Sequence, residues 1–367
     1  MEDLEEIIGF DALFKSMYKC KSGVLWKNSV ARYYTHGIEE TIKLEEQLKN
    51  GIYEPKPPKK FLITHPKQRE AISIHFRDRV YQRSINDNYL YPTMTKGFIA
   101  DNFACQKGKG TDKARDRLDE FLHKFYRKNK INGYVLQCDI KGYYPNMSHE
   151  IVEEMFEKKI DGEIKERTFR VLREQYDGEV GYNPGSQMVQ ITGISLLNGL
   201  DHFIKERLRC MLYLRYMDDF IIISEDKQYL QKCKEEIGKY LSDLQFTLHP
   251  KKTRIYDLKQ GIMFLGFKHK LTDTGKVLRL INPENVKAEK RKLRKMVELV
   301  AQGKMTEAKL NMCYNSWKAH ANSGNSFLLI QKMDKYLKEL KKETLNERRN
   351  NCSEDNADLR KEQNRTY

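Results

Sequence analysis

Apolar and polar residues alternate along this chain with the period of a helix in some stretches and of a strand in others. The helical period runs from Asp11 to Asn50 and stops at "NGIYEPKPP", where a glycine and three prolines break any helix. The same period indicates helices at 149–175, 189–209 and Lys227–Leu244. The basic segment 59–92 indicates a short strand followed by a helix. Helices are therefore expected to form much of the structure.

Three apolar runs have the composition and period of β-strands. "YVLQCDI", from Tyr134 to Ile140, is one such run and contains an aspartate near its end. The stretch "MLYLRYMDDFIIIS" has two β-rich halves that meet at Met217–Asp219, which predicts a hairpin. A second hairpin is predicted in "IMFLGFKHKLTDTGKVL", with its turn at 273–275. Helices combined with hairpins of this kind indicate an α+β fold.

The C-terminal part of the chain reads as basic helices. Asn282 is a suitable N-cap and Pro283 suits the first helical position that follows it. The last residues, "NERRNNCSEDNADLRKEQNRTY", contain almost no apolar side chains. Because such a segment cannot bury enough apolar surface to order itself, it is predicted to be disordered or dependent on a partner.

The charge of the chain points to a polyanionic partner. Its 367 residues carry a formal net charge of +15, and each cation that neutralises a phosphate releases a counterion. Nucleic acid is therefore favoured over a membrane. The acidic start "MEDLEEIIGFDALF" is unlike a signal peptide and no apolar run is long enough to span a bilayer, so a cytoplasmic location is expected. The seven scattered cysteines are expected to be reduced packing residues.

Three aspartates stand where the predicted strands end or turn. Asp139 follows a β-rich run, and Asp218 and Asp219 lie side by side at the predicted hairpin turn. A single aspartate in such a place is usually a cap or a turn residue, but three clustered carboxylates repel each other unless cations compensate. Mg²⁺ binds one or two carboxylates and leaves its other positions to phosphates and water. Two such ions about 4 Å apart are the arrangement used for nucleotidyl transfer.

The motifs around these aspartates carry a family resemblance. "YMDD" at Tyr216–Asp219, preceded by "CDIKGYYPNMSHE" at Cys138–Glu150, resembles the reverse transcriptases, and the resemblance runs from about Lys59 to the basic helices. It implies an α+β right-hand polymerase with fingers, a palm of antiparallel sheet backed by helices, and a helical thumb. The implied divisions are N-terminal helices and fingers at 1–130, palm at 131–281 with a fingers-side helical insertion at about 149–180, thumb at 282–342, and a disordered tail at 343–367.

The resemblance implies roles for the residues of the carboxylate cluster. Asp139 and Asp218 would bind two Mg²⁺ ions, for which Mn²⁺ is the expected substitute, and the backbone carbonyl of Ile140 would join them. Asp219 would shape the field with weaker direct coordination. Tyr144 matches the aromatic gate whose ring lies under the sugar and clashes with a 2′-hydroxyl. Deoxynucleoside triphosphates are therefore the expected substrates.

Two fingers motifs are implied to contact the incoming triphosphate. In "PKQREAIS", Arg69 is the best candidate because a guanidinium binds phosphate oxygens in pairs, and Lys67 is the next. Lys67 is equally well explained by a solvated basic loop. In "FACQKGKGTDKA", Gln106 stands where many relatives have arginine, which leaves Lys107 and Lys109 as substitutes.

The segment "NPGSQMVQITG" matches the glycine-led motif that backs the template and the nascent base pair. Gly185 and Gln190 have the spacing of the diversity-generating retroelement enzymes, with Val189 in the place of their serine. Most other reverse transcriptases have a proline-glutamine-glycine motif here instead. Gln190 is implied to contact the nucleotide, but it is explained equally well by a capping or packing role in its own helix.

The remaining motifs are implied to hold the leaving group and the nucleic acid. In "LHPKKTRIY", Lys252 matches the lysine that protonates pyrophosphate, although paired lysines are more often a solvated face. The "FLGF" motif matches the primer-grip hairpin, and the basic helices match a thumb that contacts phosphates without reading sequence. The residues implied to contact nucleic acid are Phe264, Leu265, Gly266, Lys290, Arg291 and Arg294.

Three functional hypotheses remain open from the sequence. The first is an RNA-directed DNA polymerase of a bacterial or phage diversity-generating retroelement, supported by Gly185, Gln190 and the thumb segment "SWKAHA". Its expected partners are an RNA template, an RNA/DNA duplex, a structured non-coding RNA and a small basic helical accessory protein. The second is an antiphage-defence or retron-like reverse transcriptase, because Val189 and Gln106 depart from the first pattern. The third is an inactive nucleic-acid-binding scaffold, against which the retained carboxylates argue. Tyr144 and the "YMDD" form also argue against a viral RNA polymerase.

Overall fold

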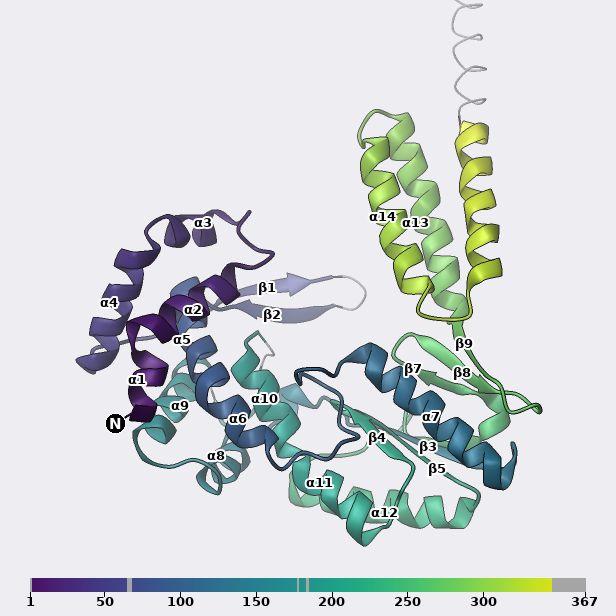
Figure 1. Ribbon diagram of the computed structural model, residues 1–367, viewed down its shortest axis with the longest axis horizontal. Coiled ribbons are helices and arrows are strands. Elements are labelled where there is room, and N and C mark those ends of the chain that lie inside the picture. The colour runs from purple at the N-terminus through teal and green to yellow at the C-terminus, as the bar shows by residue number, and fades with distance from the viewer. Residues whose placement is uncertain (1, 65–67, 177, 183–184, 345–367) are drawn as a thin grey trace, which may run out of the picture. The chain divides into compact units, whose positions relative to one another are not determined.

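The computed structural model describes residues 2–64, 68–176, 178–182 and 185–344 (Figure 1). The chain forms two compact units. The first unit consists of Met1–Leu118 and Gly133–Tyr256, and the second of Asp119–Asn132 and Asp257–Tyr367. Helices and antiparallel sheets occur in both, which confirms the predicted α+β class. The finer division into fingers, palm and thumb at the predicted boundaries stays a prediction.

Four helices open the first unit. They are α1 (Glu2–Ile8), α2 (Phe10–Lys21), α3 (Asn28–Thr35) and α4 (Gly37–Lys49). The helical pattern predicted over 11–50 is thus divided among α2, α3 and α4. The chain leaves the helical path after Lys21, where Gly23 has a φ of 72°, a conformation that costs glycine little and other residues more.

A hairpin and three short helical segments follow. Strands β1 (Lys59–Ile63) and β2 (Arg69–Ser73) pair antiparallel, so the predicted single strand is half of a hairpin. The second strand escaped the sequence pattern because β1 is almost entirely exposed and no buried apolar alternation marks the pair. The helical segments are α5 (Phe76–Ile85), η1 (Asn86–Leu90) and α6 (Tyr91–Thr95).

A four-stranded sheet forms the centre of the first unit. Its strands are β3 (Tyr134–Asp139), β4 (Tyr213–Tyr216), β5 (Asp219–Ser224) and β6 (Arg254–Asp257), in the order β4-β5-β3-β6. The hairpin predicted at Met217–Asp219 is confirmed, with Met217 at a φ of 57° in its turn. Helix α12 (Lys227–Asp243), also as predicted, packs against β3 and β5.

The helices between β3 and β4 are shorter than the sequence indicated. The predicted helix 149–175 is two helices, α8 (His149–Glu157) and α9 (Gly162–Gln175), and Gly162 has a φ of 60° at the break. The predicted helix 189–209 is three segments, listed in chain order as α10 (Gln187–Leu196), α11 (Asn198–His202) and η3 (Phe203–Arg207). A cap starts α10 early, because the Ser186 hydroxyl accepts a hydrogen bond from the backbone N–H of Val189.

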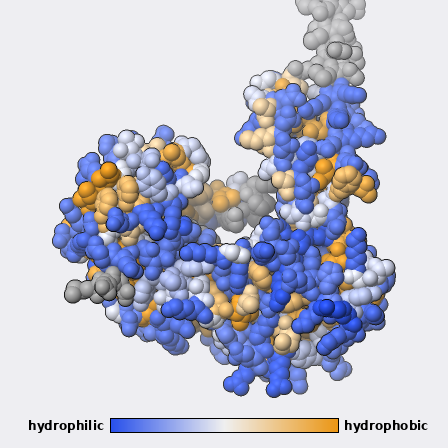
Figure 2. Space-filling view, in the orientation of Figure 1, coloured by the Kyte–Doolittle hydropathy of each residue, from blue (hydrophilic) through white to orange (hydrophobic). Residues whose placement is uncertain are grey.

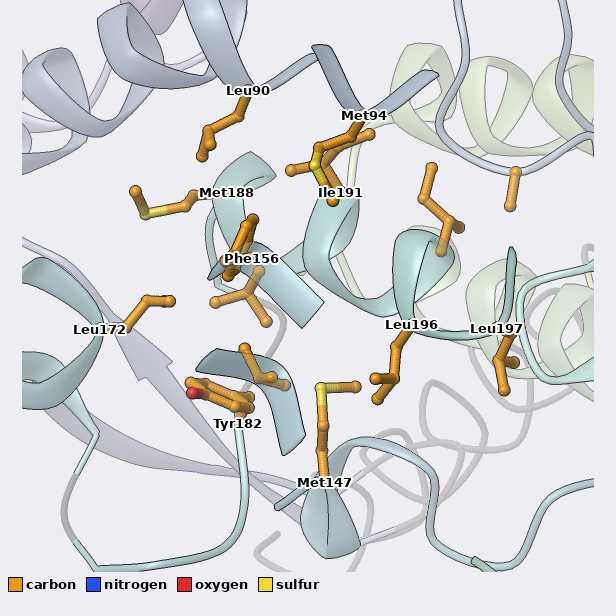
Figure 3. Packing of buried hydrophobic residues seen from close by; sticks show 14 of the residues in the cluster. Leu90, Met94, Met147, Phe156, Leu172, Tyr182, Met188, Ile191, Leu196 and Leu197 are labelled. Atoms are coloured by element: carbon orange, nitrogen blue, oxygen red, sulfur yellow. The ribbon is translucent and has the colours of Figure 1, made fainter. Parts of the chain in front are cut away.

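The core of the first unit is built where these helices meet. Figure 3 shows Met188, Ile191 and Leu196 of α10 directed towards side chains of neighbouring elements. Phe156 of α8 and Leu172 of α9 are buried in the same cluster. Helix α10 packs against α5, α6 and α8, so its apolar residues are buried on most sides. This packing fixes the helix that follows the glycine-led motif.

The second unit joins a small sheet to a helical bundle. Strands β7 (Ile262–Phe264), β8 (Phe267–Leu271) and β9 (Val277–Ile281) form an antiparallel sheet, so the predicted hairpin has an additional strand before it. The part of α7 (Thr111–Asn129) that follows Leu118 belongs to this unit. The bundle consists of α13 (Pro283–Ala301), α14 (Glu307–Ala321) and a helix over 327–344.

Several sequence predictions for the second unit can be compared with the structure. Asn282 caps α13 as predicted, since its side chain accepts a hydrogen bond from the Glu284 N–H at 3.1 Å. Trp317 packs against the apolar clusters of the bundle and the small sheet, as expected of a core anchor. The predicted tail lies, from residue 345 on, outside the described residues. Within the described ranges no helix is long and apolar enough to cross a membrane, and the described cysteines form no disulfide.

Candidate active site

The sheet of the first unit brings the three aspartates together. Asp139 is the last residue of β3 and Asp219 the first of β5, and the two are partners in the antiparallel ladder. Asp218 occupies the turn immediately before β5. The apolar run from Phe220 to Ile223 is buried and anchors this end of the sheet. The predicted proximity of the three carboxylates thus follows directly from strand pairing.

Burial and repulsion between carboxylates disfavour the charged forms of Asp218 and Asp219. Burial, together with the charge of Asp139, raises the pKa of Asp218. Burial, and then the charges of Asp139 and Asp218, raise the pKa of Asp219 to about 7, although a hydrogen bond from Gln137 acts in the opposite direction. Carboxylates held in this way are stabilised by a bound cation.

The third acidic residue, Asp139, already has a cationic neighbour. The ammonium of Lys252 lies 2.9 Å from Oδ1 and 2.7 Å from Oδ2 of Asp139. The backbone of Asp139 is held by the loop that carries this lysine, because the His249 N–H donates to its carbonyl at 2.7 Å. Lys252 is half exposed and can leave the carboxylate. Its role as a general acid stays a prediction.

The donor set fits Mg²⁺ that is shared with a substrate. Among the described residues, no three His, Cys, Asp or Glu side chains are grouped so as to hold a metal by themselves. Asp139 and Asp218 offer two carboxylates, which is as many as Mg²⁺ usually takes from a protein when phosphates and water complete its shell. Ile140 is buried beside them and forms a β-bridge with Leu248. The two hydrogen bonds of this bridge are made by the backbones of Asp139 and Lys141, so neither uses the Ile140 carbonyl. When bound, two such ions would activate a hydroxyl nucleophile and stabilise the leaving phosphates.

Tyr144 lies between the turn of the aspartates and helix α10. Its hydroxyl is 3.9 Å from Sδ of Met217, and burial raises its pKa well above the ordinary value. A Cβ added to Gly193 would lie 2.9 Å from the Tyr144 hydroxyl oxygen, so only glycine leaves room for the ring. Tyr143 instead packs in the core and donates to the Gly193 carbonyl, as expected of a packing residue.

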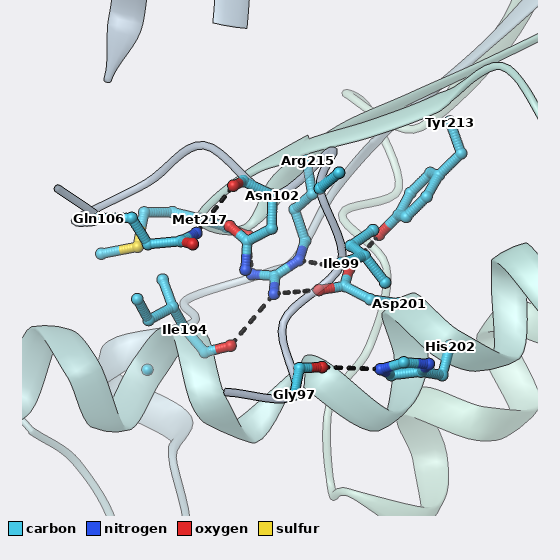
Figure 4. Close-up of polar contacts among 12 residues, drawn as sticks. Gly97, Ile99, Asn102, Gln106, Ile194, Asp201, His202, Tyr213, Arg215 and Met217 are labelled. Carbon is cyan, nitrogen blue, oxygen red and sulfur yellow. Dashed lines mark hydrogen bonds and ion pairs between the residues drawn. The ribbon is translucent and has the colours of Figure 1, made fainter. Parts of the chain in front are cut away.

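A buried ion pair beneath the turn was not found by sequence reasoning. Figure 4 shows Arg215 of β4 directed towards Asp201 of α11. Its Nε and Nη2 atoms lie 2.7 Å and 2.5 Å from the two carboxylate oxygens, and both side chains are completely buried. The Tyr213 hydroxyl donates to the same carboxylate at 2.6 Å. Burial is the largest influence on the pKa of Arg215 and acts to lower it, but the charge of Asp201, the hydrogen bond to that carboxylate and the nearby Tyr213 and Tyr143 together raise the pKa.

Arg215 also connects the ion pair to the turn that carries Asp218. Its Nη1 donates to the carbonyl of Met217 at 2.9 Å, and its Nη2 donates to that of Ile194 in α10 at 3.1 Å. The backbone of Arg215 pairs with the loop at 101–103, because its N–H donates to Asp101 and its carbonyl accepts from Phe103. The side chain of Arg215 therefore holds the turn and α10, and its backbone holds this loop.

The same loop carries the residues that replace the arginine of the second fingers motif. Gln106 donates to the Asn102 carbonyl at 2.7 Å, which stabilises the loop itself. Lys109 donates to three loop carbonyls at 2.7–3.4 Å, and burial lowers its pKa. Lys107 is exposed and its ammonium lies 5.0 Å from the Tyr91 ring centroid. Of the two lysines, Lys107 is therefore the better candidate for a phosphate contact.

The glycine-led motif lines a groove on the first unit. Gln190 stands at the wall of a cavity of about 320 Å³ with Cys105, whose thiol lies 3.7 Å from the Gln190 side-chain oxygen. Gln190 does not cap α10, since Ser186 does so, and Val189 beside it is buried. Gly185 is exposed just before the helix. Because Gln190 lines the cavity and does not cap the helix, its contact with the nucleotide stays a prediction.

The first fingers motif is described only in part. Arg69 begins β2, where it pairs with Ile63, and the structure gives no account of its side chain. Lys67 lies outside the described residues. Their predicted contacts with a triphosphate therefore stay predictions.

The predicted nucleic-acid contacts of the second unit divide into a turn and a helix. Leu265 and Gly266 form the turn between β7 and β8 with φ values of 44° and 88°. Phe264 is 1% exposed, so its ring supports the turn from inside and leaves contact to the two turn residues. Lys290, Arg291 and Arg294 are exposed on α13. Both Lys290 and Arg294 contact Tyr336: the Lys290 ammonium lies 4.9 Å from its ring centroid, and Arg294 Nη2 donates to its hydroxyl at 3.4 Å.

Comparison with known proteins gives one family and several distant folds. Residues 55–269 match the family model of the reverse transcriptases (RNA-dependent DNA polymerases). Among solved structures, apo telomerase from Candida tropicalis, truncated from its C-terminal domain, has a TM-score of 0.46 and 16% identity, covering 66% of this chain and 60% of its own. Telomerase from Candida albicans in complex with the TWJ fragment of telomeric RNA has a TM-score of 0.47 and 13% identity, covering 79% and 59%. The chain thus spans less than two thirds of these telomerases. No curated protein sequence matches it.

Proposed function

The chain belongs to the reverse transcriptase family, and from this membership we propose that it is an RNA-directed DNA polymerase that copies an RNA template into cDNA. The single observation that carries the proposal is the meeting of Asp139, Asp218 and Asp219 at the end of β3 and the start of β5. The family match contains all three residues, and it confirms the predicted right-hand polymerase class.

In this proposal each residue of the site has a defined task. Asp139 and Asp218 would hold Mg²⁺ where the two central strands end, with the Ile140 carbonyl beside them, and Asp219 would contribute negative field. Lys252 moves from Asp139 to the leaving pyrophosphate and delivers a proton to it. Arg69, Lys67, Gly185 and Gln190 line the nucleotide. The second unit supplies Leu265, Gly266 and the cations of α13 for the RNA/DNA duplex.

The biological setting proposed is a diversity-generating retroelement of a bacterium or phage. Gly185, Gln190 and the "SWKAHA" segment support it. The proposed partners are deoxynucleoside triphosphates, a structured non-coding RNA that carries the template, and a small basic helical accessory protein. An antiphage-defence or retron-like enzyme is the second candidate, favoured by Val189 and Gln106, which differ from the retroelement pattern. The neighbouring genes distinguish the two, since a variable repeat beside its template copy supports the first and a defence island the second.

One experiment tests the activity and identifies the template together. The full chain is purified from cells that contain its own neighbouring genes, and the nucleic acid that copurifies is sequenced. Mg²⁺ and labelled deoxynucleotides are then added, with Asp139→Asn as the matched control. We expect labelled DNA complementary to a copurified RNA from the wild type alone. Equal signals from both proteins would contradict the proposal. Nucleotide binding without Mg²⁺-dependent extension would indicate the inactive scaffold instead.

Sugar selection provides a separate prediction. Tyr144→Ala is expected to raise incorporation of ribonucleotides relative to deoxynucleotides by about tenfold or more, because the ring that clashes with a 2′-hydroxyl is removed. Gly193→Ala keeps the Tyr144 side chain, but it is expected to alter the same ratio because its Cβ would displace the Tyr144 hydroxyl. The measurement is kcat/KM for each nucleotide on one template–primer. Tyr143→Phe, which changes only a packing tyrosine, serves as control. An unchanged ratio in both test variants would remove Tyr144 from the role of gate.

A further inference from the structure

The N-terminal helices carry an exposed surface in which aromatic rings and cations alternate. This aromatic platform consists of Tyr18, Lys21, Trp26, Lys27 and Tyr34, from α2, the following loop and α3. Trp26 is 77% exposed and Tyr18 is 45% exposed. Figure 2 shows hydrophobic residues among hydrophilic ones over this group of helices. Large apolar side chains exposed together on a folded unit mark an interaction surface.

The cations of the platform lie on the faces of its rings. The Lys21 ammonium is 3.6 Å from the ring centroid of Tyr34 and 4.3 Å from that of Tyr18, and the two rings meet edge to face at 5.8 Å. The Lys27 ammonium is 5.4 Å from the Trp26 ring centroid. Such pairs stabilise a surface only modestly, and the unburied Trp26 ring adds nothing to the core. The combination of flat rings and cations is the arrangement that binds single-stranded nucleic acid, where bases stack and phosphates are neutralised.

A polar groove of about 190 Å³ lies on the first unit. Its wall includes Lys19 of α2 and Ser22, the residue that caps the end of that helix, and both are close in sequence to Lys21 of the platform. Gln190 belongs to the same wall and also lines the cavity beside Cys105. The groove wall consists of Lys19, Cys20, Ser22, Arg79, Gln82, Arg83, Gly185, Ser186, Gln187 and Gln190.

The charges of the groove are mainly basic. Arg79 and Arg83 of α5 face it together with Lys19, and Asp87 is the carboxylate that pairs with them among the described residues, 2.6 Å from Lys19 and 2.8 Å from Arg83. One acid against three cations leaves a positive path suited to a phosphate backbone. Within the first unit, this groove therefore joins the glycine-led motif to α2, the helix that carries Tyr18 and Lys21 of the platform.

We propose that the aromatic platform binds single-stranded RNA, namely the part of the template that has not yet been copied. This inference rests on the proposed polymerase function. In this proposal the phosphate backbone follows the groove from Gln190 along α5 to α2, and the exposed ring of Trp26 stacks on a base that follows. A protein partner fits less well, since the platform places a cation on the face of each of its rings and its neighbouring groove is basic rather than apolar.

The first test measures binding to the full chain without catalysis. Fluorescence anisotropy with a labelled oligouridylate of about twelve nucleotides gives the affinity, at a length that suits a site of this kind. Trp26→Ala is expected to weaken binding about tenfold, because one stacking contact is lost. Trp26→Phe retains most of the affinity, whereas Trp26→Leu, which keeps apolar area without an aromatic face, does not. Ile38→Ala on α4, a residue that is 62% exposed and outside the platform, is the control and stays unchanged.

The second test separates this inference from the proposed function. Primer extension is measured on RNA templates with a long or a short single-stranded 5′ overhang. Trp26→Ala raises KM about tenfold for the long overhang and leaves the short one unchanged, with kcat preserved in both. Equal KM values, together with wild-type affinity for the oligouridylate, overturn the platform even if extension is active. A wild type that binds the oligouridylate through Trp26 but makes no DNA leaves the platform standing and removes the polymerase.

Discussion

Asp218→Asn is expected to abolish DNA synthesis, lowering the single-turnover rate by at least about a thousandfold, which corresponds to about 4 kcal/mol of transition-state stabilisation. Asp218 stands at the turn and is one of only two side chains assigned to Mg²⁺, so its replacement removes half of the protein's carboxylate ligands. Asp219→Asn is expected to retain measurable activity. Asp219 is the first residue of β5 and is not one of the two side chains assigned to Mg²⁺, so its replacement leaves both proposed metal-binding carboxylates in place.

The measurement is extension of a labelled primer on an RNA template over a range of Mg²⁺ concentrations. Thermal unfolding without added metal controls for misfolding. Both variants are expected to melt no lower than the wild type, because each removes a charge from a cluster in which the carboxylates repel each other. Equal losses of activity would contradict the distinction between the two aspartates, and a fully active Asp218→Asn protein would exclude Asp218 as a metal ligand.

The strand and turn positions of the three aspartates could be predicted because each depends on a local apolar pattern, whereas their meeting depends on the pairing of β3 with β5, which are far apart in the sequence. The apolar run after Asp219 and the β-rich run before Asp139 have the strand period, and a turn between two strands puts Asp218 at their end. Pairing of the two strands then brings all three carboxylates together. The cap of α13 by Asn282 was predictable for the same reason, since it depends on neighbouring residues.

Features that depend on contacts between distant segments were not predictable. Arg215 looks like one polar position in a strand, and Asp201 like a polar position in a helix, and only the fold makes them a buried pair. The continuous helix predicted over 189–209 concealed the break after Leu196 that begins α11. Gly193 likewise appears ordinary in sequence, because the ring of Tyr144 that requires it comes from another element. An isolated charge within an apolar run was the one available signal for Arg215.

Arg215→Met is expected to lower the free energy of unfolding by about 3–5 kcal/mol and to reduce polymerase activity strongly. The substitution leaves the Asp201 carboxylate buried without its cation, and it also removes the donor to the Met217 carbonyl. Chemical denaturation gives the stability and primer extension gives the rate. Lys205→Met, which breaks the more accessible ion pair with Asp101, is the matched control and is expected to cost less stability.

The double variant Arg215→Met with Asp201→Asn separates folding from positioning. The amide that replaces the carboxylate of Asp201 carries no charge, and its oxygen can still accept the hydrogen bond from Tyr213, so most of the lost stability is expected to return. Activity is expected to stay low, because nothing replaces the guanidinium that holds the catalytic turn at Met217 and α10 at Ile194. If the double variant recovers its polymerisation rate together with its stability, Arg215 serves folding alone. If stability returns while the polymerisation rate stays low, the buried pair positions the aspartates for metal binding. The buried charge of Arg215 then serves to keep the turn at Met217 rigid.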